Sequence, residues 1–351
     1  MLIQKEVMYL DLATRKQKVL AAIVESYIAT GEPVGSKSLL EQLDISVSSA
    51  TIRNEMADLT SRGYLLQPHT SAGRIPSQKG YRFYVDNFLK TPALHERIKE
   101  YIDRNLEAKA NSPENLLETA CKIVSEITDL ASVATAPPES ESRIMRIKFV
   151  QTGRHTAMVV VVTSTGMVRN RLFRCEFVLN DEILQIFEKA LNERLAGFEL
   201  TQLTQPVIQT IAASFGELSL FMPSVLTAIK ETADSVSEMK TAVSGQIKLL
   251  FTPEIDFETS RNLVAFLSSE DNISELFSNM GYGTNVIIGR ENQLPQLFNS
   301  SVVATRYEIQ GVPAGVLAVL GPIRMNYGAV SSILEYTAKT VSSFLNEIIR
   351  I

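Results

Sequence analysis

Apolar residues recur at helical spacing through the first sixty residues and predict three short helices. The first covers about 14–30, beginning at a capping Thr14 and ending at the Gly-Glu-Pro run at 31–33. A second helix opens at Gly35-Ser36. After a tight turn at 44–47, Ser48 caps the third.

The third predicted helix has one apolar and one polar face. Three apolar residues at i, i+4 and i+7 pack inward in this pattern: Ile52, Met56 and Leu59. The opposite side carries Ala50 and Asn54, with Thr51 and Arg53 on its flanks. Small residues beside hydrogen-bonding ones suit a helix that enters the major groove of DNA closely.

The helical period stops near Gly63, and the next residues predict a short strand at 64–66 and a turn-rich hairpin over 67–76. We expect Gly73 at the tip of this hairpin, with His69 and Arg74 nearby, where a cation can meet phosphates or a narrow minor groove. Three helices followed by a hairpin predict a winged helix-turn-helix over 1–92. The same elements also build winged helices that bind proteins, and this alternative stays open on pattern alone.

The rest of the chain predicts a mixed body. One or two helices over 95–130 precede an expected linker at 131–142. Three alternating strands and a helix follow, over 144–150, 157–163, 168–173 and 180–195. Near the C-terminus three more strands and a long helix are predicted over 286–289, 302–309, 315–320 and 330–348. We expect these strands to form an antiparallel sheet flanked by helices, from 93–197 and 283–351, interrupted by a mainly helical insertion over 198–282. The fold class is therefore α+β and multidomain.

Composition places the 351-residue chain among globular proteins, with 45% hydrophobic and 21% charged residues. No apolar run is long enough to span a bilayer, and the first twelve residues do not resemble a secretory signal, so we expect no membrane partner. Two cysteines far apart suit a reducing cytoplasm. The net charge is −5, but residues 1–95 hold eleven cations and nine anions and carry +2, which leaves −7 for the remainder.

Enzyme signatures are missing from the sequence. Neither glycine-rich phosphate loops, a G-x-S-x-G elbow nor an H-E-x-x-H zinc motif occurs, and none of the three histidines has an evident partner. We expect no catalysis, no metal and no cofactor.

Two distinctive segments, together with the third-helix sequence 48–59, closely resemble the HrcA family of heat-inducible transcription repressors. One is the hairpin 69–76 running into Lys79-Gly80-Tyr81-Arg82. The other lies near the C-terminus: Leu320-Gly321-Pro322-Ile323-Arg324-Met325-Asn326-Tyr327. The similarity covers both ends of the chain, and the segment 198–282 matches only loosely.

The resemblance implies a GAF-like domain for the body and a role in dimerisation for the insertion. It also implies a negative regulator of chaperone operons that binds double-stranded DNA at a CIRCE-type inverted repeat. In this family a GroEL-type chaperonin helps the repressor reach or hold its active form. A cytoplasmic homodimer with two winged helices matches the symmetry of an inverted repeat.

Nine residues are our candidates for DNA contact. We expect Thr51, Arg53 and Asn54 in the major groove and His69 and Arg74 at the wing. Four residues at the starts of the second and third helices are expected to meet phosphates: Ser36, Lys37, Ser48 and Ser49.

Two alternatives remain at this point. A winged-helix repressor could bind a small metabolite in its GAF-like domain, although the same apolar strands are also explained simply as core. An enzyme with an appended winged helix is a third class, which the missing motifs disfavour.

Overall fold

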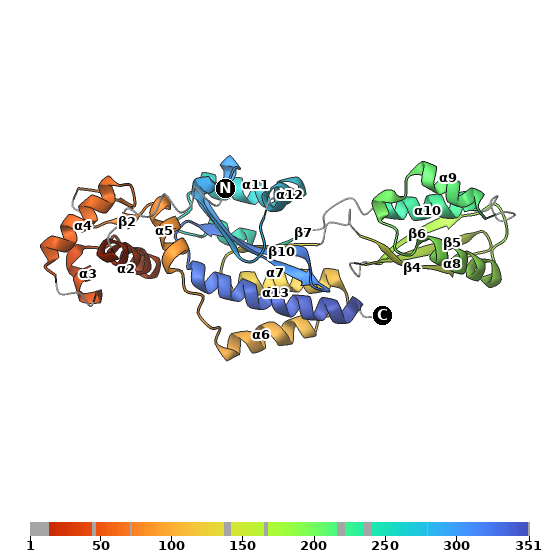
Figure 1. Ribbon diagram of the computed structural model, residues 1–351, viewed down its shortest axis with the longest axis horizontal. Helices are drawn as coiled ribbons and strands as arrows, with labels where there is room; N and C mark the ends of the chain where they lie inside the picture. Colours follow the sequence, from red (N-terminus) through yellow and green to blue (C-terminus); the bar gives the residue numbers. More distant parts are fainter. Residues whose placement is uncertain are drawn as a thin grey trace.

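The computed structural model describes residues 14–43, 47–70, 72–136, 142–164, 168–215, 222–234, 241–278 and 280–349. Three parts lie in a row along the molecule (Figure 1). We call them the head (14–88), the central unit (89–136 with 241–349) and the outer unit (142–234). The chain passes through the central unit twice, because the outer unit is inserted between its two segments.

The head begins with the three predicted helices, α2 (Thr14–Thr30), α3 (Ser36–Gln42) and α4 (Ser49–Ser61). The Ser48 hydroxyl accepts a hydrogen bond from the Thr51 amide at 3.1 Å, which confirms the predicted cap. Residues 44–46 of the expected turn lie outside the described residues. The hairpin strands β1 (Leu65–Leu66) and β2 (Ile75–Pro76) pair antiparallel, and α5 (Gln78–Phe88) follows them.

The central unit is built on a five-stranded antiparallel sheet in the order β7-β3-β10-β9-β8. Its strands are β3 (Ala131–Thr135), β7 (Thr241–Ser244), β8 (Asn285–Ile288), β9 (Ser300–Ile309) and β10 (Val312–Pro322). One face packs against three helices, α6 (Glu96–Glu107), α7 (Pro113–Thr128) and α13 (Tyr327–Ile349). The other face is covered by short segments, η4 (Gln246–Leu250), α11 (Phe257–Leu267), α12 (Glu270–Ser278) and η6 (Pro295–Leu297).

The expected linker at 131–142 is partly wrong, because Ala131–Thr135 is strand β3. β7 and β10 pair with its two edges, and all five of its residues are buried. A strand enclosed on both faces has no polar positions to alternate with apolar ones, so its small residues gave no strand signal. Pro137 and Pro138 lie outside the described residues.

The outer unit has its own three-stranded antiparallel sheet, β4 (Ile144–Gln151), β5 (Thr156–Thr163) and β6 (Val168–Arg174). Helices α8 (Asp181–Leu195), α9 (Gln205–Ala213) and α10 (Met222–Asp234) complete it, with the short η2 (Leu200–Gln202) between α8 and α9. Its buried apolar residues form a separate core.

The expectation that these strands share one sheet with those near the C-terminus is therefore wrong. Alternation predicts a strand but not its partner, and strands joined by short turns pair with each other first. The boundaries expected at 197/198 and 282/283 do not coincide with the division between sheets. The strands of 144–174 belong to the insertion, while β7, α11 and α12 belong to the central unit.

Candidate nucleic-acid interface

The outward face of α4 is open to solvent. Ala50, Arg53 and Asn54 are exposed and Thr51 is half-buried, while the apolar stripe packs inward: Ile52, Met56 and Leu59. This is the division that the helical period predicted. Helices α3 and α4 also lie at the end of the molecule farthest from the outer unit, and α5 lies between them and the central sheet (Figure 1). Neither body unit covers the face.

A group of hydroxyls joins the starts of α3 and α4. The Ser36 and Ser49 hydroxyls lie 3.1 Å apart, and the Ser48 and Thr51 hydroxyls lie 3.0 Å apart. Lys37 is exposed beside them. The structure therefore brings together the residues expected at the two helix starts, and the hydroxyl contact fixes the first turn of α4 against α3.

Two carboxylates on α4 are matched by cations from α2, a feature that the sequence analysis missed. Glu55 is buried, and its carboxylate accepts from the Arg15 guanidinium. Asp58 pairs with Lys16 at 2.6 Å and with Arg62 at 3.0 Å. The hydrogen bond from Lys16, above all, holds the pKa of the Asp58 carboxyl below its ordinary value of 3.8. These pairs neutralise the negative charge that α4 would otherwise bring toward a phosphate backbone.

The hairpin differs from expectation at its base. Residues Val34 and Arg74 exchange two backbone hydrogen bonds of 2.9 Å, so the segment after α2 runs beside the hairpin. A Cβ on Gly73 would lie 2.4 Å from the Val34 carbonyl oxygen. Gly73 is therefore required at this close backbone approach and does not lie at the tip, as we expected.

Arg74 is half-buried, and its Nε donates to the Thr60 hydroxyl at 3.0 Å. The side chain thus links the hairpin to the last turn of α4. His69 and Thr70 are exposed, and Gln67 donates to the Thr70 carbonyl at 2.9 Å. Of the two residues expected to act at the wing, His69 is presented to solvent and Arg74 contacts the protein itself.

Three groups with potential reactivity, Cys121, His95 and His155, have structural partners. Burial raises the pKa of the Cys121 thiol to about 11, so it is protonated at neutral pH. His95 caps α6, and His155 contacts the Phe177 carbonyl at 2.9 Å. The described residues contain no group of three or more His, Cys, Asp and Glu side chains placed to hold a metal ion. None of the described helices combines the length and apolarity needed to cross a bilayer.

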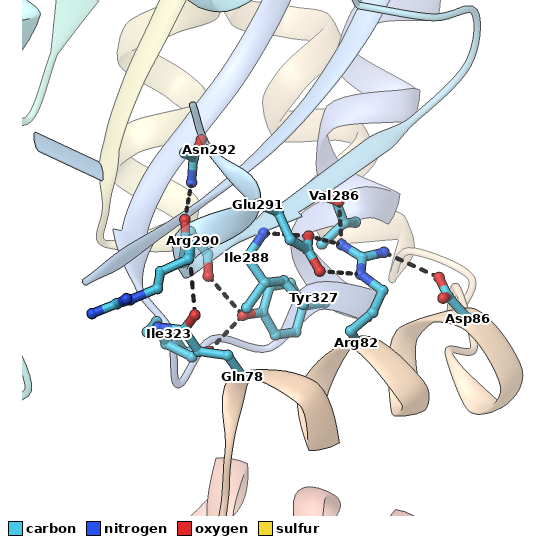
Figure 2. Close-up of polar contacts among 12 residues, drawn as sticks. Gln78, Arg82, Asp86, Val286, Ile288, Arg290, Glu291, Asn292, Ile323 and Tyr327 are labelled. Carbon is cyan, nitrogen blue, oxygen red and sulfur yellow. Dashed lines mark hydrogen bonds and ion pairs between the residues drawn. The ribbon is translucent and has the colours of Figure 1, made fainter. Parts of the chain in front are cut away.

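The two most distinctive sequence segments meet at the junction of head and central unit. Tyr81 of α5 packs against Tyr327 at the start of α13, with ring centroids 6.0 Å apart. Figure 2 shows Arg82 of the same helix between Glu291 and Asp86. The sequence alone assigns no role to Tyr81, Arg82 or the segment 320–327, because nothing local indicates that residues so far apart in the chain are in contact.

Comparisons with known proteins agree over nearly the whole length. A family model described as "HrcA protein C terminal domain" matches residues 114–330. "Heat-inducible transcription repressor HrcA" of Acetivibrio thermocellus is 33% identical over 346 residues, covering 97% of this chain and 98% of that protein. The protein of the same name from Carboxydothermus hydrogenoformans is 35% identical over 332 residues, covering 94% and 97%.

A solved structure titled "Crystal structure of a hypothetical protein at 2.2 A resolution" matches with a TM-score of 0.63 and 26% identity, covering 96% of this chain and all of that one. The fold and the relatives agree with the resemblance seen in the sequence. This chain belongs to the HrcA family of heat-inducible transcription repressors, which are regulators and not enzymes.

Proposed function

We propose that the chain represses chaperone operons by binding, as a homodimer, to a CIRCE-type inverted repeat in double-stranded DNA in the cytoplasm. In this proposal the head is a winged helix-turn-helix and the central unit is GAF-like. The observation that carries the proposal is the solvent-exposed face of α4. Cations of α2 pair with the carboxylates of this helix, and the helix lies at the end of the molecule farthest from the outer unit. A helix with these properties fits the major groove.

Three residues on or beside this face read bases in our proposal. Arg53 and Asn54 are exposed, and both side chains can form bidentate hydrogen bonds to base edges; Thr51 lies on the flank. Residues at the starts of the two helices bind phosphate: Ser36, Lys37, Ser48 and Ser49. His69 is the wing contact. We assign Arg74 to bracing the wing against α4, because its guanidinium donates to Thr60.

Dimerisation is proposed at the outer unit, on the sheet face that α8 and α10 do not cover. By strand register this face carries six apolar residues, with Arg146, Lys148, Asn170 and Arg174 among them: Val150, Met158, Val160, Val162, Val168 and Leu172. Val150, Val168 and Leu172 are 47%, 51% and 65% exposed. Exposed apolar side chains gathered on one sheet face favour burial against a second copy. The proposed surface lies within 144–174, outside the segment 198–282 where we expected it.

Modulation by a GroEL-type chaperonin is the third part of the proposal. The central unit exposes four large apolar side chains close together in sequence: Ile247, Leu250, Phe251 and Phe257. Chaperonins of this type bind exposed apolar surface, and a repressor with a small stability margin shifts its active population when that help is withdrawn. These exposed side chains support the proposed interaction.

Arg53→Ala tests the DNA-binding part directly. A bidentate base contact contributes about 1–3 kcal/mol, so we expect roughly tenfold to hundredfold weaker binding to an inverted-repeat duplex in a mobility shift. Lys122→Ala removes an exposed cation from α7 and is the matched control, expected to bind like the unchanged chain. Unchanged affinity of the Arg53 variant, with an intact circular dichroism spectrum, would refute the assignment.

The alternative of a small metabolite inside the GAF-like sheet has less support. Apolar side chains pack both faces of the five-stranded sheet, and two cavities of about 720 and 930 Å³ lie between units. Calorimetric titration with the chaperonin and with a metabolite panel separates the two forms of regulation.

A further inference from the structure

The junction between head and central unit is tightly held at three places. The first is the contact of α5 with β8 and the turn after it, shown in Figure 2. Arg82 donates from Nε and Nη2 to the two oxygens of Glu291, at 2.7 and 2.6 Å. It also donates to the Val286 carbonyl and to Asp86. Each of its three nitrogens therefore donates, and a bidentate pair of this geometry fixes orientation as well as distance.

Glu291 is also held in place by a contact within the central unit. Its Oε2 accepts from the Ile288 amide at 2.8 Å. Burial opposes the charge on Arg82, but the hydrogen bonds and charges of Glu291 and Asp86 outweigh it and raise the pKa of the guanidinium.

Gln78 adds a second polar contact one turn earlier on α5. Its amide donates to the Phe298 carbonyl at 3.1 Å and accepts from the Arg290 amide at 3.0 Å. Gly289 has a left-handed φ of +54°, and a Cβ there would lie 2.3 Å from the Gln78 side chain. The backbone of the central unit has thus approached as closely as glycine allows.

The second place is the contact of Arg324 with α2, and the third is the connector at 89–95, which joins α5 to the rest of the central unit. Arg324 donates to Glu254 and, from Nη1, to the Ile28 carbonyl at the end of α2, at 2.8 Å. The connector after α5 is held where the Ser332 hydroxyl of α13 donates to the Pro92 carbonyl at 2.7 Å. A Cβ on Gly328 would lie 2.3 Å from the Lys90 carbonyl oxygen.

We propose that Gln78, Arg82 and Arg324 are positioning residues that fix the orientation of each head on its central unit. In a dimer this orientation sets the distance and rotational phase between the two α4 helices. The chain would then select inverted repeats by spacer length as well as by half-site sequence. The inference rests on the proposed dimeric binding to an inverted repeat.

Spacer length is a sensitive probe because one base pair shifts a half-site by roughly 3.4 Å and rotates it by roughly 35°. A rigid pair of heads cannot follow that change, whereas heads on a loose hinge can. The experiment measures the affinity of the full chain for duplexes with identical half-sites and spacers altered by up to five base pairs. We expect the unchanged chain to lose at least tenfold within two base pairs of its optimum.

In the double variant Arg82→Ala, Arg324→Ala, affinity should vary less than threefold over the same spacers. It should fall at the optimal spacer and stay unchanged at the others. Arg82→Lys keeps the charge but not the fork, so an intermediate profile is expected. Lys122→Ala should keep the full profile. Arg53→Ala should lower affinity equally at all spacers, because it alters base contact and not geometry.

A second readout does not depend on DNA. Spin labels at Glu41→Cys and Lys122→Cys, both exposed positions, report the distance from head to central unit. Labelled chains are diluted with unlabelled ones so that only distances within one chain are measured. We expect a narrow distribution for the unchanged chain and a broad one for the double variant. Should the double variant fail the thermal melt that checks its fold, Gln78→Ala and Arg82→Lys carry the same test.

The outcomes separate the two proposals. A sharp spacer profile and a narrow distance distribution in the junction variants would overturn the positioning role and leave the proposed function intact. No binding of the unchanged chain to any inverted repeat would overturn the proposed function, while the label distances would still decide whether these residues fix the head.

Discussion

The head and the outer unit are attached to the central unit in different ways. Buried residues of the head and of the α7 and α13 side of the central sheet form one continuous apolar core, with Tyr81 and Tyr327 in contact across the junction. The outer unit keeps its own core. Where it approaches the central unit, Arg169 reaches Glu114 at 3.4 Å beside a cavity of about 720 Å³. The end proposed to contact DNA is therefore built into the body, whereas the proposed dimerisation unit is a separately packed module.

Truncating Tyr327, whose ring packs against Tyr81 between head and central unit, should test the shared core most strongly. Tyr327 is 1% exposed, and Tyr327→Ala should lower the free energy of unfolding by about 3–5 kcal/mol, the range for deleting a large buried ring. Because the core is shared, head and central unit should lose stability together in urea unfolding followed by circular dichroism and by a label at Glu41→Cys.

Phe187→Ala is the matched control, since Phe187 is equally buried but lies in the outer core. It should destabilise the outer unit and leave the head label unaffected. If the head label reports an unchanged midpoint in the Tyr327 variant, the shared core does not couple the two parts.

A charge on the uncovered sheet of the outer unit should dissociate the proposed dimer. Leu172→Asp adds an unpaired charge to a side chain that is 65% exposed, so the fold should persist while the dimer weakens at least tenfold in sedimentation. Phe257→Asp makes the same change on the central unit, where 76% of the side chain is exposed, and should remain dimeric. Dissociation of the Phe257 variant together with an intact dimer of the Leu172 variant would place the interface on the central unit.

A smaller effect is expected from the Tyr81 hydroxyl. It is buried, and no described group hydrogen-bonds it. Tyr81→Phe removes an unsatisfied polar atom and keeps the ring contact, so unfolding should become more costly by up to about 1 kcal/mol. Thermal and urea unfolding measure this change, and a loss of stability would indicate that the hydroxyl has a partner in solution.

The smallest effect concerns Asp58, whose folded-state pKa lies below its ordinary value because of Lys16 and Arg62. A carboxyl with a lowered pKa stabilises the fold fully above its unfolded pKa, and this contribution is lost as pH falls through the folded pKa. The carboxyl is half-buried and still in contact with solvent, so Asp58→Asn should lower the Tm slightly at pH 7 and by progressively less as the pH falls through the folded pKa. A constant difference across this range would contradict the ion-pair explanation.

Much of the head could be predicted from its sequence because the cues are local. Helical period, the Ser48 cap and the Gly63 stop act within a few residues, and they gave α2, α4 and the open face of α4. The helix α13 and the strands near the C-terminus followed in the same way.

The errors concern contacts between distant segments. Ala131–Thr135 has no alternation of polar and apolar residues, since both its faces and both its edges are covered, and so the pattern does not predict a strand there. The strands of 144–174 were recognised, but their sheet was not, because alternation carries no information about partners. The turn-rich sequence predicts Gly73 at a tip, and only the position of Val34 explains why glycine is needed at the base of the hairpin. Arg82 and Glu291 are 209 positions apart, beyond any local pattern.

The pairs between α2 and α4 also determine how strongly salt should weaken binding to DNA. Each phosphate neutralised by a protein cation releases counterions and steepens the fall of log K with log salt by about 0.9. Arg15, Lys16 and Arg62 are engaged with Glu55 and Asp58, and Arg82 is engaged with Glu291. The eleven cations of residues 1–95 therefore overstate how many cations can neutralise phosphates. Each bound chain should release well under eleven counterions.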